Sequence, residues 1–403
     1  MLNLNDHALS LGTESAFGLL ATISAMQEAD LKNPEQRHDS IINLGIGQPD
    51  FQPADHIAAA AMDAIKGGAH GYTPAKGILD LRKAVIQDLI LRHGESPYLT
   101  GLEPDRVMIV PGGKVTMFQA ISLLGGAGRE IIYPDPAFPI YKSLIDHTGA
   151  KAIPLTLHAS NGFAASAAEI EKLITAKTSL IILNSPGNPT GGIIPPDEMD
   201  LIADLIAANP NIALLSDEIY DGLSFNPDDF KSFTRYGALK DQLILLDGCS
   251  KRYAMTGWRV GFGIWPAAIM PHAERLSINI HSCVNAVAQH AALAALTGDQ
   301  GKIDVMRNQF HKRATYFVNA LNQLAGFSCV MPKGAFYAFA NIEGTGLDAQ
   351  SLQRELLLKA RIGALAGDGF GAAGKGHMRF SFAASMDELE TAISRIRIFM
   401  NDL

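Results

Sequence analysis

One lysine in this sequence stands in a setting suited to covalent chemistry. Lys251 follows the largely apolar run 242–246, and the residues nearest to it are small: Gly248, Ser250, Ala254 and Gly257. An amine at the end of a buried strand can form an imine with an aldehyde, and Arg259, eight residues further on, can return to hold a phosphate with two parallel N–H donors. A lone lysine is usually a solvated surface charge, but such a lysine does not need this run of small neighbours. The pattern therefore favours a catalytic lysine.

A carboxylate and a phenol come directly after another apolar run. Asp217 and Tyr220 follow the predicted strand 212–215. Ligands of open α/β sheets bind at the carboxyl ends of the strands, so the Asp217 carboxylate is expected to face a pocket. For the adjacent Glu218, an exposed position in a solvated turn remains one of the interpretations.

A third group of residues has the composition of a phosphate cradle. Gly112, Gly113 and Lys114 lie between a predicted strand and the helical run 115–124. Backbone N–H groups that open a helix bind phosphate. A nucleotide P-loop is excluded, because Met108 stands where such a loop requires a glycine. The three residues are therefore the candidate phosphate site.

The segment 248–261 resembles, at every constrained position, the pyridoxal 5′-phosphate (PLP) attachment signature of the class I and II aminotransferases. The resemblance to aspartate-aminotransferase-like enzymes of this family extends from about Ser15 to Phe382. It implies that Lys251 holds PLP as a Schiff base, the internal aldimine, and then moves a proton during catalysis. It also implies that the negative charge of Asp217 keeps the pyridine nitrogen of the cofactor protonated.

The same resemblance assigns residues to the cofactor ring. Asn188, in the loop 184–192, and Tyr220 would contact the ring O3′, and Phe138 would stack on the ring. Taken alone, a loop rich in Pro, Gly and Asn is only a turn signal, and core packing is the alternative for Phe138. The bond between Asn188 and Pro189 is a candidate cis peptide.

The phosphate is assigned to residues from several parts of the chain. Arg259 would hold it together with the segment 112–114. Relatives often carry a phosphate-binding serine three residues before the lysine, where this chain has Gly248, so Ser250 is the candidate substitute. Tyr72 would reach the phosphate of a neighbouring subunit, which implies a homodimer.

The substrate carboxylate is assigned to residues at both ends of the chain. Gly47 would approach it through its backbone amide, and Arg379 would grip it with two parallel N–H donors beside Asn188. A surface salt bridge is the alternative for Arg379. The substrate side chain is expected to be neutral or apolar, because an acidic one would lose its hydration without gaining a partner in a pocket lined by Phe17, Ile46 and Phe138.

These groups need a fold that brings distant strand ends together. β-rich runs alternate with helical stretches at 107–110, 130–133, 151–157, 179–183, 212–215 and 242–246. The alternation indicates an α/β fold with a mostly parallel sheet covered by helices. The run 259–265 follows too closely for a parallel crossover, so the expected seven-stranded sheet contains one antiparallel strand.

The pattern changes after residue 285 to long amphipathic helices and a few strands, at 336–341, 362–366 and 378–382. This change indicates a smaller α+β domain built from both chain ends. The predicted boundaries are 53–290 for the large PLP-binding domain, and 1–52 with 291–403 for the small domain. Ser385 and Glu388 have the spacing of a capping box at the start of the last helix.

Composition narrows the classes of function. The formal charge of −8 and the scattered basic residues argue against a nucleic-acid partner. No run of about 18 apolar residues and no signal peptide is present, so a cytoplasmic location without membrane association is expected. Three cysteines are too few and too far apart for a disulfide framework or a zinc cluster, and no metal is expected.

The motifs together predict an enzyme that moves the amino group of an L-amino acid to a 2-oxo acid by a ping-pong mechanism. A carbon–sulfur lyase is the alternative within PLP chemistry, because lyases share this scaffold. A PLP-fold regulator that senses a ligand is the alternative from a different class. Such regulators usually carry a DNA-binding domain, and the short segment before Ser15 has no room for one.

Overall fold

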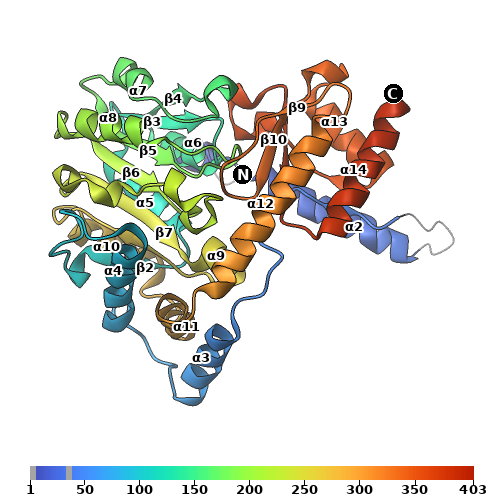
Figure 1. Ribbon diagram of the computed structural model, residues 1–403. Helices are drawn as coiled ribbons and strands as arrows, with labels where there is room; N and C mark the ends of the chain where they lie inside the picture. The colour runs from blue at the N-terminus through green and yellow to red at the C-terminus, as the bar shows by residue number, and fades with distance from the viewer. Residues whose placement is uncertain (1–5, 33–38) are drawn as a thin grey trace.

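The computed structural model describes residues 6–32 and 39–403, so residues 1–5 and 33–38 of the predicted small domain lie outside the described residues. Figure 1 shows two lobes: a larger one built on a central sheet, and a smaller one that contains both α2 (Ser15–Lys32) and the C-terminal elements. Helix α12 (Gly301–Leu321) runs from one lobe toward the other. We propose that the boundaries predicted above separate these two lobes.

The large sheet has seven strands within the described ranges. Their spatial order is β2 (Val107–Val110), β8 (Gly261–Ile264), β7 (Leu243–Gly248), β6 (Ala213–Asp217), β5 (Thr178–Asn184), β3 (Glu130–Asp135) and β4 (Lys151–Thr156). Strand β8 is antiparallel to both of its neighbours, and the other pairings are parallel. The predicted α/β class and the single antiparallel strand are therefore confirmed.

Helices cover both faces of this sheet, which explains why strands such as β2 (VMIV) are apolar and buried throughout. One face packs on α4 (Leu79–His93), α7 (Ala167–Leu173), α8 (Pro196–Ala207) and α11 (Ala286–Thr297). The other packs on α5 (Lys114–Leu124), α6 (Ile140–Thr148) and α10 (Met270–His281). Alternate residues of β2 enter the two cores, as Ile109 and Val110 illustrate. Helix α3 (Asp55–Lys66) packs against α11.

The small lobe has its own core around a short antiparallel sheet. Its order is β12 (Leu365–Ala366), β13 (His377–Ser381), β10 (Tyr337–Asn341) and β9 (Ser328–Cys329). Strand β1 (Ile42–Asn43) pairs in parallel with β11 (Ile362–Gly363). The single strand predicted at 362–366 is thus wrong, because its first half pairs with β1 and its second half with β13.

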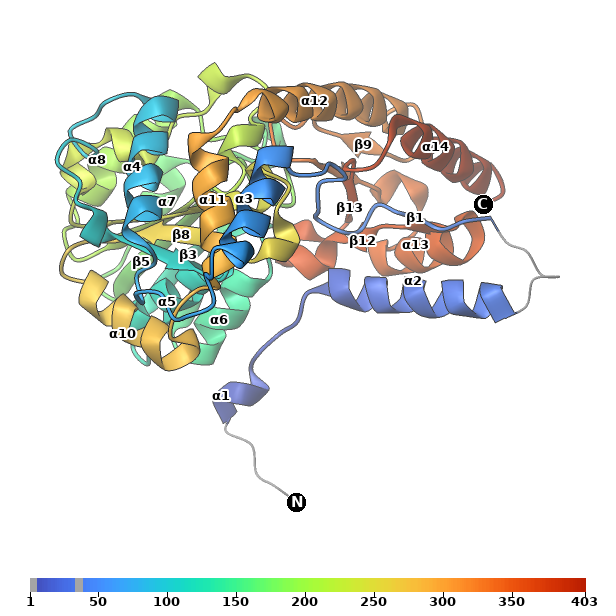
Figure 2. The ribbon, with the colours of Figure 1, turned by 90° about the horizontal axis from the view of Figure 1, so that it is seen from below.

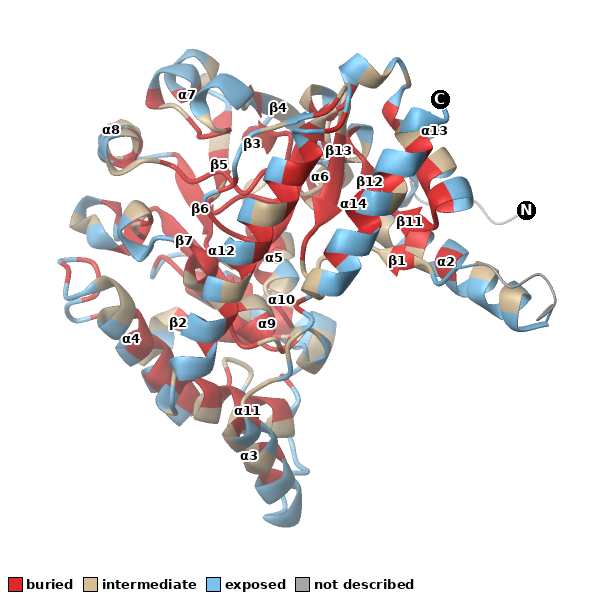
Figure 3. Ribbon diagram, turned by 45° about the vertical axis from the view of Figure 1, so that its right-hand side comes forward, coloured by how far each residue is buried: buried red, intermediate tan, exposed pale blue. Residues whose placement is uncertain are grey.

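Residues far apart in the sequence build this lobe. Figure 2 shows α2 and β1 beside β12, α13 (Ala349–Glu355) and the C-terminal helix α14 (Met386–Asn401). The predicted capping box at the start of α14 is confirmed, since Ser385 and Glu388 each bond the backbone N–H of the other. Figure 3 shows buried residues along the inner strands of both lobes. No helix of the described residues is long and apolar enough to cross a bilayer.

Candidate active site

The predicted catalytic lysine lies at the end of β7, on the short helix α9 (Cys249–Arg252). Its Nζ donates a 2.6 Å hydrogen bond to the carbonyl oxygen of Gly47 and lies 5.9 Å from the ring centroid of Tyr220. Burial lowers the pKa of Lys251 to about 8, and the charges of Arg379 and Arg259 act in the same direction. A substantial part of the amine is therefore neutral, and so nucleophilic, near pH 8.

Asp217 is the last residue of β6 and is fully enclosed. Tyr141 donates a 2.6 Å hydrogen bond to its Oδ2, and the N–H of Ile219 donates to its Oδ1 at 3.2 Å. Burial raises the pKa of Asp217 to about 6, although these two hydrogen bonds oppose the shift. A cation placed against this carboxylate would be strongly held, because the carboxylate has little water to lose.

The adjacent Glu218 corrects the sequence interpretation. It is 2% exposed and is not part of a solvated turn. Its Oε1 accepts hydrogen bonds from the Ser216 hydroxyl and from the N–H of Phe233, and burial raises its pKa to about 7. Glu218 therefore fastens the loop after β6 to the core.

Tyr220 joins the two lobes. Its hydroxyl lies 2.8 Å from the hydroxyl of Tyr337, a residue of β10 in the small lobe. Burial raises the pKa of Tyr220 well above the usual value for a phenol, so the group stays protonated and can donate. Tyr337 also restricts residue 47 to glycine, because a Cβ on Gly47 would collide with the Tyr337 hydroxyl. The sequence offered no signal for Tyr337, which lies in an ordinary apolar strand.

Arg379, on β13, is buried against two aromatic rings. Its guanidinium carbon lies 4.4 Å from the ring centroid of Tyr337 and 4.7 Å from that of Phe370. Its Nη1 donates to Oδ1 of Asn188 at 2.9 Å, and its Nη2 donates to the carbonyl of Gly45 at 2.6 Å. Its Nε has no partner among the described residues. Burial lowers the pKa of Arg379, so an incoming carboxylate would relieve an unfavourable charge.

The loop that carries Asn188 is fixed beside Asp217. The Asn188–Pro189 peptide bond, for which the sequence offered a cis form only as a candidate, is cis. The side chain of Asn184 accepts a 2.9 Å hydrogen bond from the N–H of Asn188 and donates a 3.0 Å bond to the carbonyl of Asp217. The loop thus presents the Asn188 side chain between Arg379 and the end of β6.

The candidate phosphate site combines a helix start with a guanidinium. Helix α5 begins at Lys114, and Gly112 has a φ of 89°, which favours glycine. Arg259 lies directly over Gly112: its Nη2 donates to the carbonyl of Pro111 at 3.3 Å, and a Cβ on Gly112 would collide with the guanidinium. A helix N-terminus beside a guanidinium fits a phosphate dianion.

Three glycines bring this phosphate loop against the lysine segment. A Cβ on Gly261 would lie 2.7 Å from the N of Gly113, and a Cβ on Gly248 would lie 2.7 Å from the Cα of Gly261. A side chain at position 248 therefore has no room. Ser250 is buried on α9 and remains the candidate substitute.

The side chain of Lys114 has a partner that the sequence did not suggest. It forms an ion pair with Glu14, the residue before α2, and its Nζ lies 5.3 Å from the ring centroid of Phe138. Phe138 in turn packs edge to face on Tyr141, with centroids 5.9 Å apart. Tyr141 follows Phe138 by three residues. This spacing is typical of a helical turn, and it could have indicated from the sequence that Tyr141 belongs to the site.

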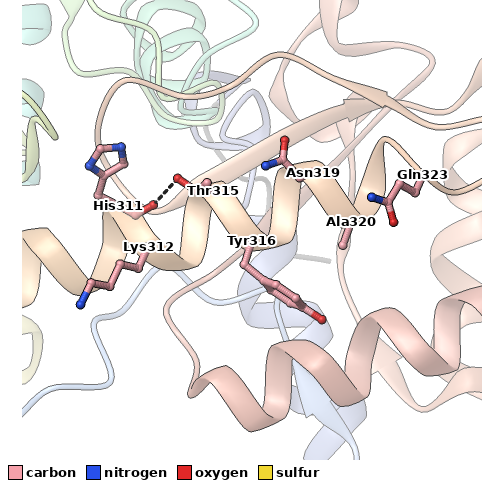
Figure 4. A pocket seen from close by; sticks show the side chains of 7 residues that line it. All are labelled: His311, Lys312, Thr315, Tyr316, Asn319, Ala320 and Gln323. Carbon is pink, nitrogen blue, oxygen red and sulfur yellow. Dashed lines mark hydrogen bonds between the residues drawn. The ribbon is translucent and has the colours of Figure 1, made fainter.

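Two predicted residues are largely exposed. The side chain of Tyr72 is 93% exposed, and that of Phe17 is 63% exposed. In this chain, therefore, neither is part of an enclosed pocket. A surface groove of about 490 Å³ on α12 contains none of the predicted site residues (Figure 4); it is lined by His311, Lys312, Thr315, Tyr316, Asn319, Ala320 and Gln323.

The chemistry of this donor set fits the cofactor that the resemblance implies. A lysine of lowered pKa, a buried carboxylate, two phenols and a guanidinium beside a helix N-terminus match the aldehyde, the ring nitrogen, the ring oxygen and the phosphate of PLP. No cluster of three or more His, Cys, Asp or Glu among the described residues could hold a metal ion.

Comparison with known proteins identifies the family. The family described as "Aminotransferase class I and II" matches residues 39–396. A probable N-acetyl-LL-diaminopimelate aminotransferase of Bacillus subtilis is 35% identical over 364 residues, covering 90% of each chain. An aspartate/prephenate aminotransferase of Nitrosomonas europaea is 33% identical over 369 residues, covering 89% of this chain and 91% of that one.

The fold comparison gives the same family. The aspartate aminotransferase of Rhizobium meliloti superposes with a TM-score of 0.90 at 27% identity and covers 100% of this chain and 99% of its own. The match spans both lobes, and the resemblance drawn from the segment 248–261 is confirmed. The chain belongs to the class I and II aminotransferases, and it is an aminotransferase whose cofactor is PLP.

Proposed function

We propose that this aminotransferase carries PLP on Lys251 and moves the amino group of an L-amino acid to a 2-oxo acid in two half-reactions. The observation that carries the proposal is the convergence of the Lys251 amine, the Tyr220–Tyr337 pair and the Arg379 guanidinium from both lobes. The first would hold the aldehyde carbon, and the last would hold the substrate carboxylate. The pair between them links the two lobes.

Different residues around Lys251 would bind different parts of the cofactor. The phosphate would lie against Gly112, Gly113 and Lys114 at the start of α5, with Arg259 and Ser250 as further donors. Asp217 would face the ring nitrogen, and its buried charge favours the protonated ring. Asn188 and Tyr220 would hold the ring oxygen. Phe138 would cover the ring face.

When bound, PLP withdraws electrons from the α-carbon of the attached amino acid. Lys251 would take the proton from the α-carbon and deliver it to the former aldehyde carbon of the cofactor, which suits an amine whose pKa is about 8. Arg379 fixes the plane of the carboxylate, and so the direction of the Cα–H bond, through two N–H groups beside Asn188. Gly47 would approach the carboxylate through its backbone amide, and the lack of a side chain there leaves room for the hydroxyl of Tyr337.

The proposal includes a homodimer. The Tyr72 ring is 93% exposed although a phenol of this size usually packs, and a neighbouring subunit would cover it. A cavity of about 640 Å³ adjoins Arg259, and a partner's tyrosine could enter it. Sedimentation of the active protein at assay concentration measures the oligomeric state directly, and a fully active monomer would contradict the proposed homodimer.

The test of the proposed function is a two-substrate assay with a matched variant. Purified protein loaded with PLP is given an amino acid and a 2-oxo acid, and both products are quantified. Lys251→Ala should lower kcat by at least about 10³-fold, because it removes both the attachment point and the proton carrier. Release of ammonia and a 2-oxo acid without any acceptor would instead indicate a lyase.

A further inference from the structure

A buried cluster of charges lies behind the site, on the side of α4. Arg92, in the last turn of α4, donates to three carboxylates at once. Its Nε bonds Asp88 at 2.8 Å, its Nη2 bonds Asp247 at 2.9 Å, and its Nη1 bonds Asp221. All four side chains are at most 11% exposed. Burying such a cluster of charges costs desolvation free energy, so a contribution to stability alone does not explain it.

The three acceptors belong to different segments of the chain. Asp88 lies on α4 itself, Asp221 directly follows Tyr220, and Asp247 lies in β7, four residues before Lys251. Asp247 is tied closely to the lysine segment, since its Oδ1 also accepts a 2.6 Å hydrogen bond from the N–H of Gly248. One guanidinium thus spans the loop of Tyr220 and the strand that ends at Lys251.

A second guanidinium, from the residue that follows the lysine, also binds a carboxylate of this cluster. Arg252 directly follows Lys251, and its Nη1 lies 2.9 Å from both carboxylate oxygens of Asp88. The lysine is therefore flanked by two anchored residues, Asp247 before it and Arg252 after it. Although burial opposes its charge, the carboxylates Asp88 and Asp247 hold the pKa of Arg92 above its usual value, so Arg92 stays charged.

We infer that Arg92 is a positioning residue that fixes the Lys251 segment relative to the Tyr220 loop. The inference rests on the proposed roles of Lys251 and Tyr220. A planar fork with donors in fixed directions can hold three segments in one geometry, whereas a lysine ammonium at the same place is a single point with a flexible stem. Displacing a catalytic amine by about 1 Å can cost on the order of 10²-fold in rate.

The surroundings of Arg92 allow chemical rescue. A cavity of about 620 Å³ reaches the cluster, and Arg92, Asp221 and Arg252 are among the residues that line it. In Arg92→Ala, a free guanidinium ion can enter through this cavity and occupy the site of the missing side chain. Arg307 lines the same cavity but pairs with Asp304 on its own helix, so Arg307→Ala is the matched control.

The experiment compares Arg92→Ala, Arg92→Lys and Arg307→Ala as PLP-loaded enzymes, with kcat expressed per bound cofactor and melting measured in parallel. We expect Arg92→Ala to lose kcat on the order of 10²-fold with a smaller change in KM. Millimolar guanidinium should raise the kcat of Arg92→Ala by at least about tenfold, whereas ammonium at the same ionic strength should not. Arg307→Ala should keep the wild-type kcat.

The outcomes separate this inference from the proposed function. Wild-type enzyme without transaminase activity would refute the function itself. Active wild type together with an unchanged kcat in Arg92→Ala, or equal rescue by ammonium, would refute the positioning role. If Arg92→Ala does not fold, Arg92→Lys decides: a folded, loaded variant with wild-type kcat refutes the inference, and a loss of about tenfold or more supports it.

Discussion

The hydroxyl of Tyr141 donates a 2.6 Å hydrogen bond to Oδ2 of Asp217, deep below the proposed ring site. This bond favours the charged carboxylate, against a burial that raises the pKa of Asp217 to about 6. Tyr141→Phe should therefore raise that pKa further, by about one unit, and the acid side of the kcat/KM profile should move to higher pH by a similar amount. An unchanged acid limb would mean that Asp217 does not control activity.

Asp217→Asn should separate folding from catalysis. The folded-state pKa of Asp217 is raised above its unfolded value of 3.8, so the cost of the charged group to stability grows as the pH rises above 3.8, is complete above about 6, and vanishes below the unfolded pKa. The variant without cofactor should melt higher than wild type at pH 8, with the difference fading toward pH 4. Its kcat should nevertheless fall on the order of 10²-fold or more. A near-native kcat would exclude the proposed role of the charge.

The lowered pKa of Lys251 predicts how the protein without cofactor takes up PLP. Only the neutral amine attacks an aldehyde, so the rate of covalent uptake should rise with pH and level off above about 8. An ordinary lysine would level off only above about 10.4. Rapid mixing with PLP, followed by absorbance at several pH values, measures this rate, and Lys251→Ala is the control for binding without bond formation.

The ion pair between Glu14 and Lys114 predicts the choice of amino donor. The Lys114 ammonium lies 5.3 Å from the centroid of the Phe138 ring, but Glu14 already compensates its charge. Neutral donors should therefore have a higher kcat/KM than aspartate. Glu14→Gln frees the ammonium and should shift the ratio of aspartate to leucine by roughly tenfold, or about 1.4 kcal/mol. Wild type that prefers aspartate by tenfold would contradict the expectation, and Lys114→Ala is the control.

The sequence was most informative where burial on both faces of a strand demands a continuous apolar run. Strands β2, β5 and β6 follow this pattern, and polar residues at the ends of such strands, such as Asp217, mark the site. Strands β1 and β9 have two residues each and carry no periodicity, so no pattern could reveal them.

Side-chain contacts between distant segments were beyond a single sequence. Tyr337 reads as one more apolar strand residue until its hydroxyl is found on Tyr220. Arg92 resembles any helix-end cation, and its partner Asp247 lies 155 positions away. Glu218 was misjudged for the converse reason: a charged residue after a strand suggests solvent, whereas its Ser216 and Phe233 partners let it be buried.

The bare backbone contact among Gly113, Gly248 and Gly261 has a consequence for protein design. Since no side chain separates the phosphate loop from the lysine segment, no residue there can be repacked to absorb a shift between them. The two behave as one interlocked unit although they lie far apart along the chain. A designer who transplants the lysine signature into another scaffold must therefore carry over the strand β8 and the start of α5 with it.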